Sequence, residues 1–293
     1  MISSRRAHRT AGDAAGRREF LRHLAIVTGV PASLLAAVGS SAAQVTIPSE
    51  FDTSLDSVAV AFRGSSGMTL GYMSQPKATG SHPGLVLVHD IAGLTPGIRG
   101  AARNLATAGY VVVAPDFLSP KGGTASFRSV AADVQSAVNA TPATAVTTQA
   151  TAALAYAKSH GGSGGRGLAI IGFGWGGTQA LLFAAGRTDV VACAAFYPDP
   201  VQTLKVLGKI TAPMLAIFAG EDPATAAGVT AFEQAAIASR RTHTVKVFPG
   251  MMRGFHDPGE TKIYKPDVAK EAWSLAIQHL DSHTKEKAAA SGA

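Results

Sequence analysis

The sequence of 293 residues has a single cysteine, Cys193, and few charged side chains. One cysteine excludes an internal disulfide and a cysteine-built metal cluster. The apolar neighbours of Cys193, from 190 to 196, predict a buried strand in which it is a small core residue rather than a reactive thiol. Charged residues make up 15% of the chain against 46% hydrophobic residues, which is a globular composition long enough for one sizeable core.

The sequence also has little net charge beyond its first 43 residues. The total is +7, and six arginines against Asp13 and Glu19 give the first 43 residues +4, so the other 250 carry 7 − 4 = +3. This small excess argues against a nucleic-acid-binding surface. We therefore expect a small-molecule substrate or ligand as the partner, with neither nucleic acid nor a cofactor.

The apolar stretch near the N-terminus is too short to cross a membrane comfortably. It has about 15 residues, from 24 to 38, where roughly 20 are needed. It follows the pair Arg17-Arg18 and ends in small residues at 41–43, which is the order of a signal peptide of the twin-arginine route. A retained membrane anchor is the alternative. We predict that residues 1–43 are removed and that residues 44–293 are periplasmic or secreted, with no membrane span.

Short apolar runs alternate with helical patterns along the rest of the chain, without a repeat or a linker. This alternation predicts one α/β domain over 44–293, a doubly wound, mostly parallel sheet with helices on both faces. The expected strands are 55–63, 69–73, 84–89, 110–115, 168–172, 190–197, 214–219 and 244–248. The expected helices are 97–108, 128–138, 144–159, 176–186, 226–239 and 266–284. Residues 119–126 are rich in Gly and Ser, and we expect an exposed loop there.

The segment Gly172-Phe173-Gly174-Trp175-Gly176-Gly177 lies between an expected strand and an expected helix. A nucleophile elbow occupies this position in α/β hydrolases. Its turn is so sharp that the central residue, here Gly174, is expected to have a positive φ. The flanking glycines allow the strand and the helix to approach closely.

Four segments together make the chain resemble the dienelactone hydrolase family, the carboxymethylenebutenolidase type of α/β hydrolase. The resemblance covers about residues 55–284. It implies an α/β-hydrolase fold and activity on small lactones or esters. Besides the elbow, it rests on the segments Val88–Leu94, Gly109–Asp116, Phe218–Pro223 and Phe248–Asp257.

The chain departs from the pattern that this resemblance implies at two positions of the catalytic triad. The family has cysteine at the elbow, where this chain has Gly174, and histidine in the last loop, where this chain has Arg253. The acid is retained as Asp222, and the loop acid, usually glutamate, is Asp90. Gly174 has no atom that attacks, and the Arg253 guanidinium does not act as a base. Arg253 could instead form a bidentate pair with Asp222.

An oxyanion hole does not depend on those side chains, because backbone N–H groups form it. The resemblance implies that the amides of Ile91 and Trp175 are its donors. A helix that starts near Gly176 directs its positive end toward the same place. Together with Arg253, these groups lead us to expect a pocket that binds an anion or a carbonyl compound. The candidate substrate-binding residues are Ile91, Trp175, Gly174, Arg253 and Tyr197.

The candidate catalytic residues are Asp90, Asp222, His89 and His256. His89 ends a strand, and it is either a base or a hydrogen-bonded structural residue. Asp90 lies at the pocket edge, where loops after parallel strands carry function. His256 follows the expected histidine position by three residues, and a shift of its loop could bring it into the site.

Two hypotheses remain open on these residues. In the first, the chain is an enzyme without a covalent acyl intermediate, and Asp90, His89 or His256 activates water or moves a proton during hydrolysis, isomerisation or ring opening. In the second, the chain is a pseudoenzyme whose pocket binds a small acidic or carbonyl ligand without turnover. Neither hypothesis requires a metal.

Overall fold

The computed structural model describes residues 48–127, 130–160 and 167–290 of the chain. The predicted signal peptide, residues 1–43, lies outside these ranges. Among the described residues, no helix is both long and apolar enough to cross a membrane.

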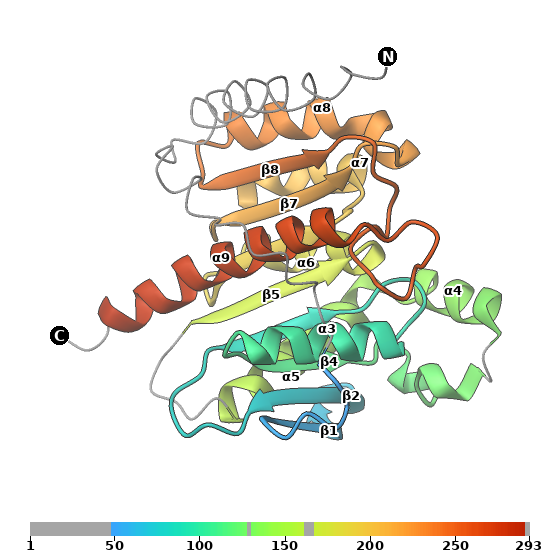
Figure 1. Ribbon diagram of the computed structural model, residues 1–293, viewed down its shortest axis with the longest axis vertical. Coiled ribbons are helices and arrows are strands. Elements are labelled where there is room, and N and C mark those ends of the chain that lie inside the picture. The colour runs from blue at the N-terminus through green and yellow to red at the C-terminus, as the bar shows by residue number, and fades with distance from the viewer. Residues whose placement is uncertain (1–47, 128–129, 161–166, 291–293) are drawn as a thin grey trace, which may run out of the picture. The chain divides into compact units, whose positions relative to one another are not determined.

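Eight strands alternate with helices in the described part of the chain (Figure 1). The strands are β1 (Leu55–Gly64), β2 (Gly67–Pro76), β3 (Gly84–Val88), β4 (Val111–Pro115), β5 (Leu168–Phe173), β6 (Val190–Phe196), β7 (Met214–Ala219) and β8 (His243–Phe248). The α-helices are α3 (Pro96–Thr107), α4 (Ala131–Asn139), α5 (Ala143–His160), α6 (Trp175–Ala184), α7 (Pro200–Thr203), α8 (Pro223–Ala238) and α9 (Pro266–Ala290). Three 3₁₀ segments are η1 (Ser119–Lys121), η2 (Thr124–Phe127) and η3 (Leu204–Lys209).

The strands form one sheet in the order β1-β2-β4-β3-β5-β6-β7-β8. The leading β1–β2 hairpin is antiparallel, and β2 also pairs with β4 in antiparallel fashion. Every pair from β4 to β8 is parallel. The predicted doubly wound, mostly parallel sheet is confirmed. Parallel strands end at the same edge of the sheet, so the loops after β3, β5 and β7 lie near one another.

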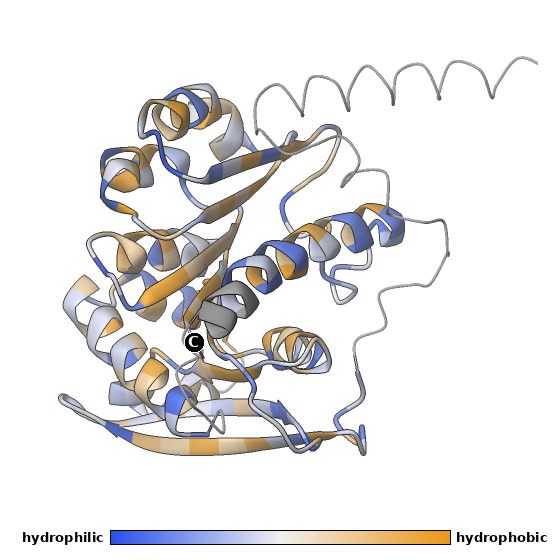
Figure 2. Cartoon of the chain, turned by 90° about the vertical axis from the view of Figure 1, so that its left-hand side faces the viewer, coloured by the Kyte–Doolittle hydropathy of each residue, from blue (hydrophilic) through white to orange (hydrophobic). Residues whose placement is uncertain are grey.

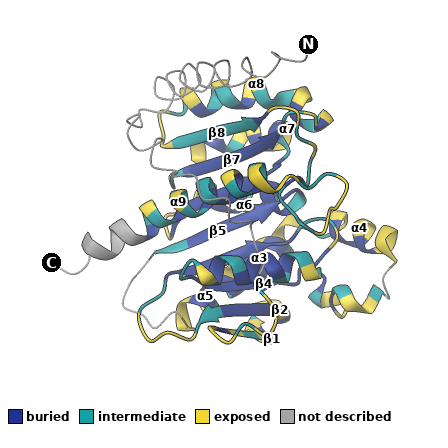
Figure 3. Ribbon diagram, in the orientation of Figure 1, coloured by how far each residue is buried: buried dark blue, intermediate teal, exposed yellow. Residues whose placement is uncertain are grey.

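The core has two layers because successive strand residues point to opposite faces of the sheet. On β3, Leu85 and Leu87 pack on the face covered by α3 and α9. Val86 and Val88 pack on the other face with α5, α6 and α8. Figure 2 shows the sheet from the side with helices on both faces. In Figure 3 the central strands are buried, and exposed residues lie on the outer surfaces of the helices.

Most predicted elements agree with the structure within a few residues, and two regions differ. Helix α8 begins three residues before the expected start at 226, since the Asp222 side chain accepts a hydrogen bond from Ala224 N at 3.1 Å and Pro223 opens the first turn. The expected exposed loop at 119–126 contains η1 and part of η2, and the Asp116 carboxylate accepts a hydrogen bond from Thr124 N at 2.6 Å. This hydrogen bond to the buried Asp116 carboxylate orders residues 119–126, although their composition is typical of an exposed loop.

Candidate functional site

The elbow between β5 and α6 has the geometry that its glycines predict. Gly174 has φ 54° and ψ −116°, which confirms the expected positive φ. A Cβ on Gly172 would overlap the backbone of Gly176, and a Cβ on Gly176 would overlap the backbone of β3 and His89. The strand and the helix therefore approach as closely as the glycines allow, and the turn has no side chain at its centre.

The Asp90 carboxylate fills the space beside this turn. Its Oδ1 accepts hydrogen bonds from Ile91 N at 2.7 Å and from Trp175 N at 2.9 Å. A Cβ built on Gly174 would lie 2.5 Å from Asp90 Cγ. The two amides expected to form the oxyanion hole therefore converge on one oxygen, and that oxygen belongs to the chain itself. The first turn of α6 further favours negative charge here.

Asp222 and Arg253 form the expected ion pair at the end of β7. Arg253 Nε donates to Asp222 Oδ2 at 2.8 Å. The contact uses Nε and one carboxylate oxygen, so the expected bidentate geometry is not the one present. The Asp222 side chain is 8% exposed and the Arg253 side chain 38%. Asp222 also caps α8, which makes its carboxylate part of the scaffold.

His89 is fully buried between the rings of Phe117 and Trp175. Its Nδ1 lies 2.8 Å from the backbone oxygen of Asp90, and its Nε2 accepts a hydrogen bond from Phe117 N at 3.2 Å. The proton must therefore be on Nδ1, because Nε2 faces a donor. Burial lowers the pKa of His89. With both ring nitrogens bonded to the backbone, this geometry favours the structural alternative over the role of a base.

His256 lies at the cavity that adjoins Asp90, so its loop brings it into the region of the site. Its ring stacks on Phe173 with centroids 4.7 Å apart and planes at 5°, and it also contacts Trp273. Its Nδ1 lies 3.1 Å from the Tyr197 hydroxyl. Burial among these rings lowers the pKa of His256 to about 3, which keeps it neutral at physiological pH.

Tyr197 is buried behind His256 and does not line the cavity, contrary to our expectation. It has a positive φ of 53°, which is uncommon for a residue with a side chain. Burial raises the pKa of Tyr197. Its hydroxyl can hold the orientation of the His256 ring, but it does not reach a ligand in the cavity directly.

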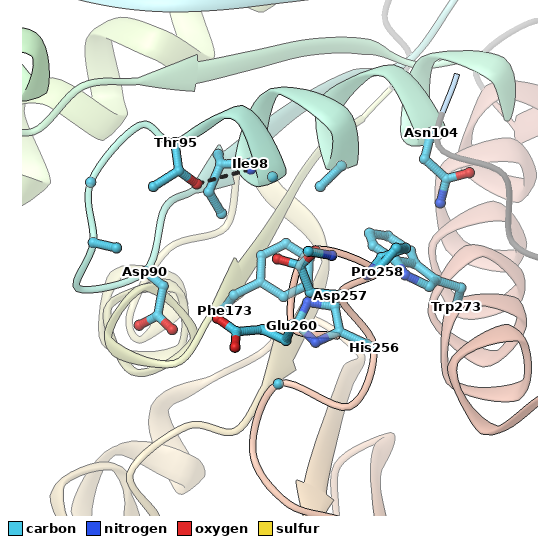
Figure 4. A pocket seen from close by; sticks show the side chains of 16 residues that line it. Asp90, Thr95, Ile98, Asn104, Phe173, His256, Asp257, Pro258, Glu260 and Trp273 are labelled. Atoms are coloured by element: carbon cyan, nitrogen blue, oxygen red, sulfur yellow. Dashed lines mark hydrogen bonds between the residues drawn. The ribbon is translucent and has the colours of Figure 1, made fainter. Parts of the chain in front are cut away.

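The cavity has a volume of about 320 Å³ and lies between the loop after β3, the start of α3 and residues 254–260. In Figure 4, Asp90 and Thr95 lie on one side of it, and His256, Asp257 and Glu260 come from the opposite loop. The lining consists of Asp90, Ala92, Gly93, Thr95, Gly97, Ile98, Ala101, Asn104, Phe173, Gly254, His256, Asp257, Pro258, Gly259, Glu260 and Trp273.

The charge of this lining argues against the anionic alternative of the expected pocket for an anion or a carbonyl compound. Three of the described lining residues are acidic, Asp90, Asp257 and Glu260, and none is a lysine or arginine. Arg253 lies outside the lining and is paired with Asp222. An anionic ligand would meet carboxylates without a compensating cation, so a neutral ligand is favoured. No group of three or more His, Cys, Asp or Glu in the described part of the chain could hold a metal ion.

Several lining residues were missed by the reasoning from sequence. Asp257 and Glu260 follow His256 closely, and Thr95 and Asn104 lie at the start and near the end of α3. Gly97 offered one signal, because a Cβ there would lie 2.9 Å from Asp257 Oδ2. A glycine in a helical turn with a close neighbour marks the approach of another segment.

The family model and the curated relatives indicate one family. The model of the dienelactone hydrolase family matches residues 70–284. A Methylorubrum extorquens protein named "Putative carboxymethylenebutenolidase" is 27% identical over 262 residues, which cover 86% of this chain and 89% of that protein. A Bradyrhizobium protein named "Probable 2-oxo-3-(5-oxofuran-2-ylidene)propanoate lactonase" is 28% identical over 226 residues, covering 73% of this chain and 89% of that protein.

Solved structures show the same architecture. The crystal structure of a "Putative Dienelactone Hydrolase" from Klebsiella pneumoniae superposes with a TM-score of 0.70 at 24% identity, covering 77% of this chain and 98% of that one. This likeness shows the α/β-hydrolase fold.

Proposed function

This chain belongs to the dienelactone hydrolase family, and from that premise we propose that it hydrolyses a small neutral lactone or ester without an acyl-enzyme. One observation carries the proposal: the amides of Ile91 and Trp175, which are not themselves among the lining residues, converge on a single oxygen of Asp90, which lines the cavity. Preorganised donors of this kind stabilise the oxyanion that forms when a carbonyl is attacked. Gly174 supplies no nucleophile, so water is the attacking group.

In this mechanism the substrate carbonyl oxygen replaces Asp90 Oδ1 on the two amides. The displaced Asp90 carboxylate remains beside the carbonyl carbon, because the substrate carbonyl now binds the two amides that the carboxylate has left. Asp90 then takes a proton from the attacking water, and the negative charge develops on the oxygen that the amides hold. When the tetrahedral intermediate collapses, Asp90 returns the proton to the leaving alkoxide, which yields the acid and the alcohol.

The cavity supports a neutral substrate. Asp257 and Glu260 lie opposite Asp90 and would repel an anion. Phe173 and Trp273 offer apolar surface to a ring. A volume of about 320 Å³ suits a small lactone. The name of the Bradyrhizobium relative refers to a lactonase, and we extend that chemistry to this chain as part of the proposal.

The proposal is tested with a panel of neutral lactones and esters. Replacing Asp90 with Asn keeps the shape but removes the base, so we expect kcat/KM to fall by about 10²–10⁴-fold. Asp199→Asn is a matched control, because Asp199 Oδ1 also accepts from two amides, Val201 N and Gln202 N, yet lies outside the cavity lining. Equal rates for wild type and Asp90→Asn on every substrate turned over would refute the role of Asp90.

A second candidate function is binding without turnover. The Asp90 carboxylate already occupies the two amides, and Arg253 locks the retained acid, Asp222. A ligand must displace Asp90 at the cost of two charge-assisted hydrogen bonds. Thermal-shift binding of a neutral lactone that is never converted to product would support this alternative over hydrolysis.

We further propose that residues 1–43 direct export by the twin-arginine route. Replacing Arg17 and Arg18 with lysine should leave the precursor in the cytoplasm. The proposal fails if the amount of exported protein is unchanged when compartments are separated and blotted.

A further inference from the structure

The Asp90 carboxylate is held as a nucleophile would be held at the elbow. Its Oδ1 accepts both amide hydrogen bonds, and Oδ2 accepts neither of them. A Cβ on Gly174 would lie 2.5 Å from Asp90 Cγ, so the carboxylate occupies the space into which an elbow side chain would project. Asp90 also lines the cavity. The loop after β3 thus places the Asp90 carboxylate at the position where the elbow residue Gly174 has no side chain.

We propose that Asp90, while bound to its two amides, attacks an electrophilic sp³ carbon, and that the cavity therefore also takes small neutral epoxides. This activity goes beyond the hydrolysis of carbonyl compounds. There Asp90 must leave the amides and act as a base, whereas here it stays in place and forms a covalent bond. Carboxylates are established nucleophiles at sp³ carbon in retaining glycosidases.

In the first step, Asp90 Oδ2 forms a bond to the less hindered epoxide carbon. The bond between that carbon and the ring oxygen breaks, and the ring oxygen keeps the electron pair. Water in the open part of the cavity protonates this oxygen and is left as hydroxide, which takes up a proton at the end of the second step. The product is a hydroxyalkyl ester of Asp90. A neutral epoxide enters the acidic lining without charge repulsion, unlike an anionic substrate.

In the second step, water attacks Asp90 Cγ. The ester carbonyl oxygen is Oδ1, which already lies 2.7 Å from Ile91 N and 2.9 Å from Trp175 N. The negative charge of the tetrahedral intermediate therefore develops on an oxygen that both amides already hold. The attacking water gives a proton to His256. Collapse breaks the bond between Cγ and the alkyl oxygen, which takes that proton back and leaves as the diol. The hydroxide left by the first step then takes the proton of the Asp90 carboxyl, which restores the carboxylate. The two amides thus serve this step without any rearrangement.

His256 is the one histidine of the described cavity lining, and it serves as the base of the second step. Burial holds its pKa at about 3, so it remains neutral but takes a proton from water reluctantly. We therefore expect the second step to be slower than the first. The Asp90 ester should accumulate during turnover and be visible as a mass increase equal to one epoxide.

The deciding experiment is a single turnover in H₂¹⁸O with wild-type enzyme in excess over 1,2-epoxybutane. If Asp90 is the nucleophile, the diol takes its new oxygen from the carboxylate, so it contains no ¹⁸O. The label then appears in the peptide that contains Asp90, where tandem mass spectrometry can locate it. In Asp90→Ala, we expect diol formation no faster than in buffer.

Asp199→Asn provides the matched control for this experiment. Its carboxylate also receives two backbone amides but lies outside the cavity lining, so this variant should form diol at the wild-type rate. The proposal is overturned if the first-turnover diol carries ¹⁸O, if the label lies on another carboxylate such as Glu260, or if wild type forms no diol. Because the readout in wild type locates the oxygen directly, it does not depend on whether Asp90→Ala folds.

The two proposals for Asp90 can fail separately. Lactone hydrolysis by the general-base route places ¹⁸O from water in the product in the first turnover and leaves Asp90 unlabelled. Epoxide opening by the covalent route gives the opposite distribution. Activity on lactones without activity on epoxides would refute only the proposal that Asp90 is a nucleophile. Activity on epoxides without activity on lactones would refute only the proposed lactone hydrolysis.

Discussion

Asp90 and Asp222 are two carboxylates at the same edge of the sheet, and their surroundings differ. Each follows a parallel strand and accepts a backbone amide at the start of a helix, α6 for Asp90 and α8 for Asp222. Asp222 is buried and paired with Arg253 at 2.8 Å. Asp90 lines the cavity, and no ion pair within the described ranges involves it.

From this difference we infer that Asp222 is a structural acid, and we propose that Asp90 is the reactive one. The charge of Asp222 is compensated by Arg253 and directed into the scaffold, away from the cavity. The charge of Asp90 is compensated by amides that leave one carboxylate oxygen outside both bonds. The family resemblance alone implies that Asp222 is the catalytic acid. The geometry of the two carboxylates leads us to propose Asp90 for that role instead.

The largest effect should separate the two acids by activity. We expect Asp90→Asn to lower kcat/KM on a neutral lactone by about 10²–10⁴-fold. Asp222→Asn should lower it by less than about 10-fold, which corresponds to about 1.4 kcal/mol. Steady-state kinetics with both purified variants measures this difference. Equal losses would mean that Asp222 also takes part in the reaction.

A second prediction concerns the space that Asp90 occupies. Gly174→Ala adds a Cβ that collides with the Asp90 carboxylate at a positive φ, so we expect a loss of stability of about 2–4 kcal/mol. Gly186→Ala is the control, because Gly186 has φ 78° and nothing within 4 Å of a Cβ. It gives the cost of an alanine at a positive φ without a collision, about 1 kcal/mol. Urea denaturation compares the two variants.

The double variant Gly174→Ala with Asp90→Gly sharpens this test. Removing the Asp90 side chain removes the collision, so the double variant should regain part of the stability that Gly174→Ala loses. If Gly174→Ala and Gly186→Ala cost the same, the Asp90 carboxylate does not occupy the elbow in solution.

The ion pair of Asp222 should be visible as a coupling free energy. Arg253→Gln leaves a buried carboxylate without its cation, and we expect a loss of about 1–2 kcal/mol, reduced from the value for a fully buried pair because Arg253 is 38% exposed. In a double-mutant cycle with Asp222→Asn, the two losses should not add. The matching cycle of Arg253→Gln with Asp90→Asn should be additive.

The smallest effect is a pH dependence on the cavity side. The pKa of His256 is lowered by burial from 6.5 to about 3, so the unfolded chain binds its proton first as the pH falls. The stabilisation is fully present above about pH 6.5 and is lost as the pH falls toward 3. Between about pH 7 and pH 6 we expect a loss of less than about 1 kcal/mol.

Urea denaturation of wild type and His256→Gln across this range gives the contribution of His256 as a difference. His279, whose pKa burial lowers to about 4, contributes to both proteins and cancels. Identical pH profiles for wild type and His256→Gln would show that the ring is not buried as the structure has it.

The fold and the elbow could be predicted because they depend on local patterns. Apolar runs and glycine spacing predicted the strands and the positive φ of Gly174, and the structure confirms both. The pairing of Asp222 with Arg253 was also predictable, since opposite charges in adjacent loops attract. In each case the residue types and their spacing along the chain are enough to predict the structure that forms.

The position of the Asp90 carboxylate could not be predicted in the same way. Residues 90 and 174 are far apart in the sequence, and the side-chain direction depends on how β3 and β5 pair. Gly174 has no Cβ, which leaves space for the Asp90 carboxylate. A glycine at the elbow together with an acid in the loop after β3 was therefore the one sequence feature that could have indicated this position. The acidic lining was not expected, because Asp257 and Glu260 reach the cavity through turns, and Asp257 Oδ1 accepts from Gly259 N at 2.8 Å.

The most direct test of the proposed hydrolysis is a crystal structure with a small neutral lactam, the hydrolysis-resistant analogue of a lactone. We expect the lactam carbonyl oxygen to lie about 3 Å from both Ile91 N and Trp175 N, with the Asp90 carboxylate turned out of its present position and adjacent to the carbonyl carbon. A lactam bound elsewhere, with Asp90 still on both amides, would contradict the proposed hydrolysis of carbonyl compounds at this site.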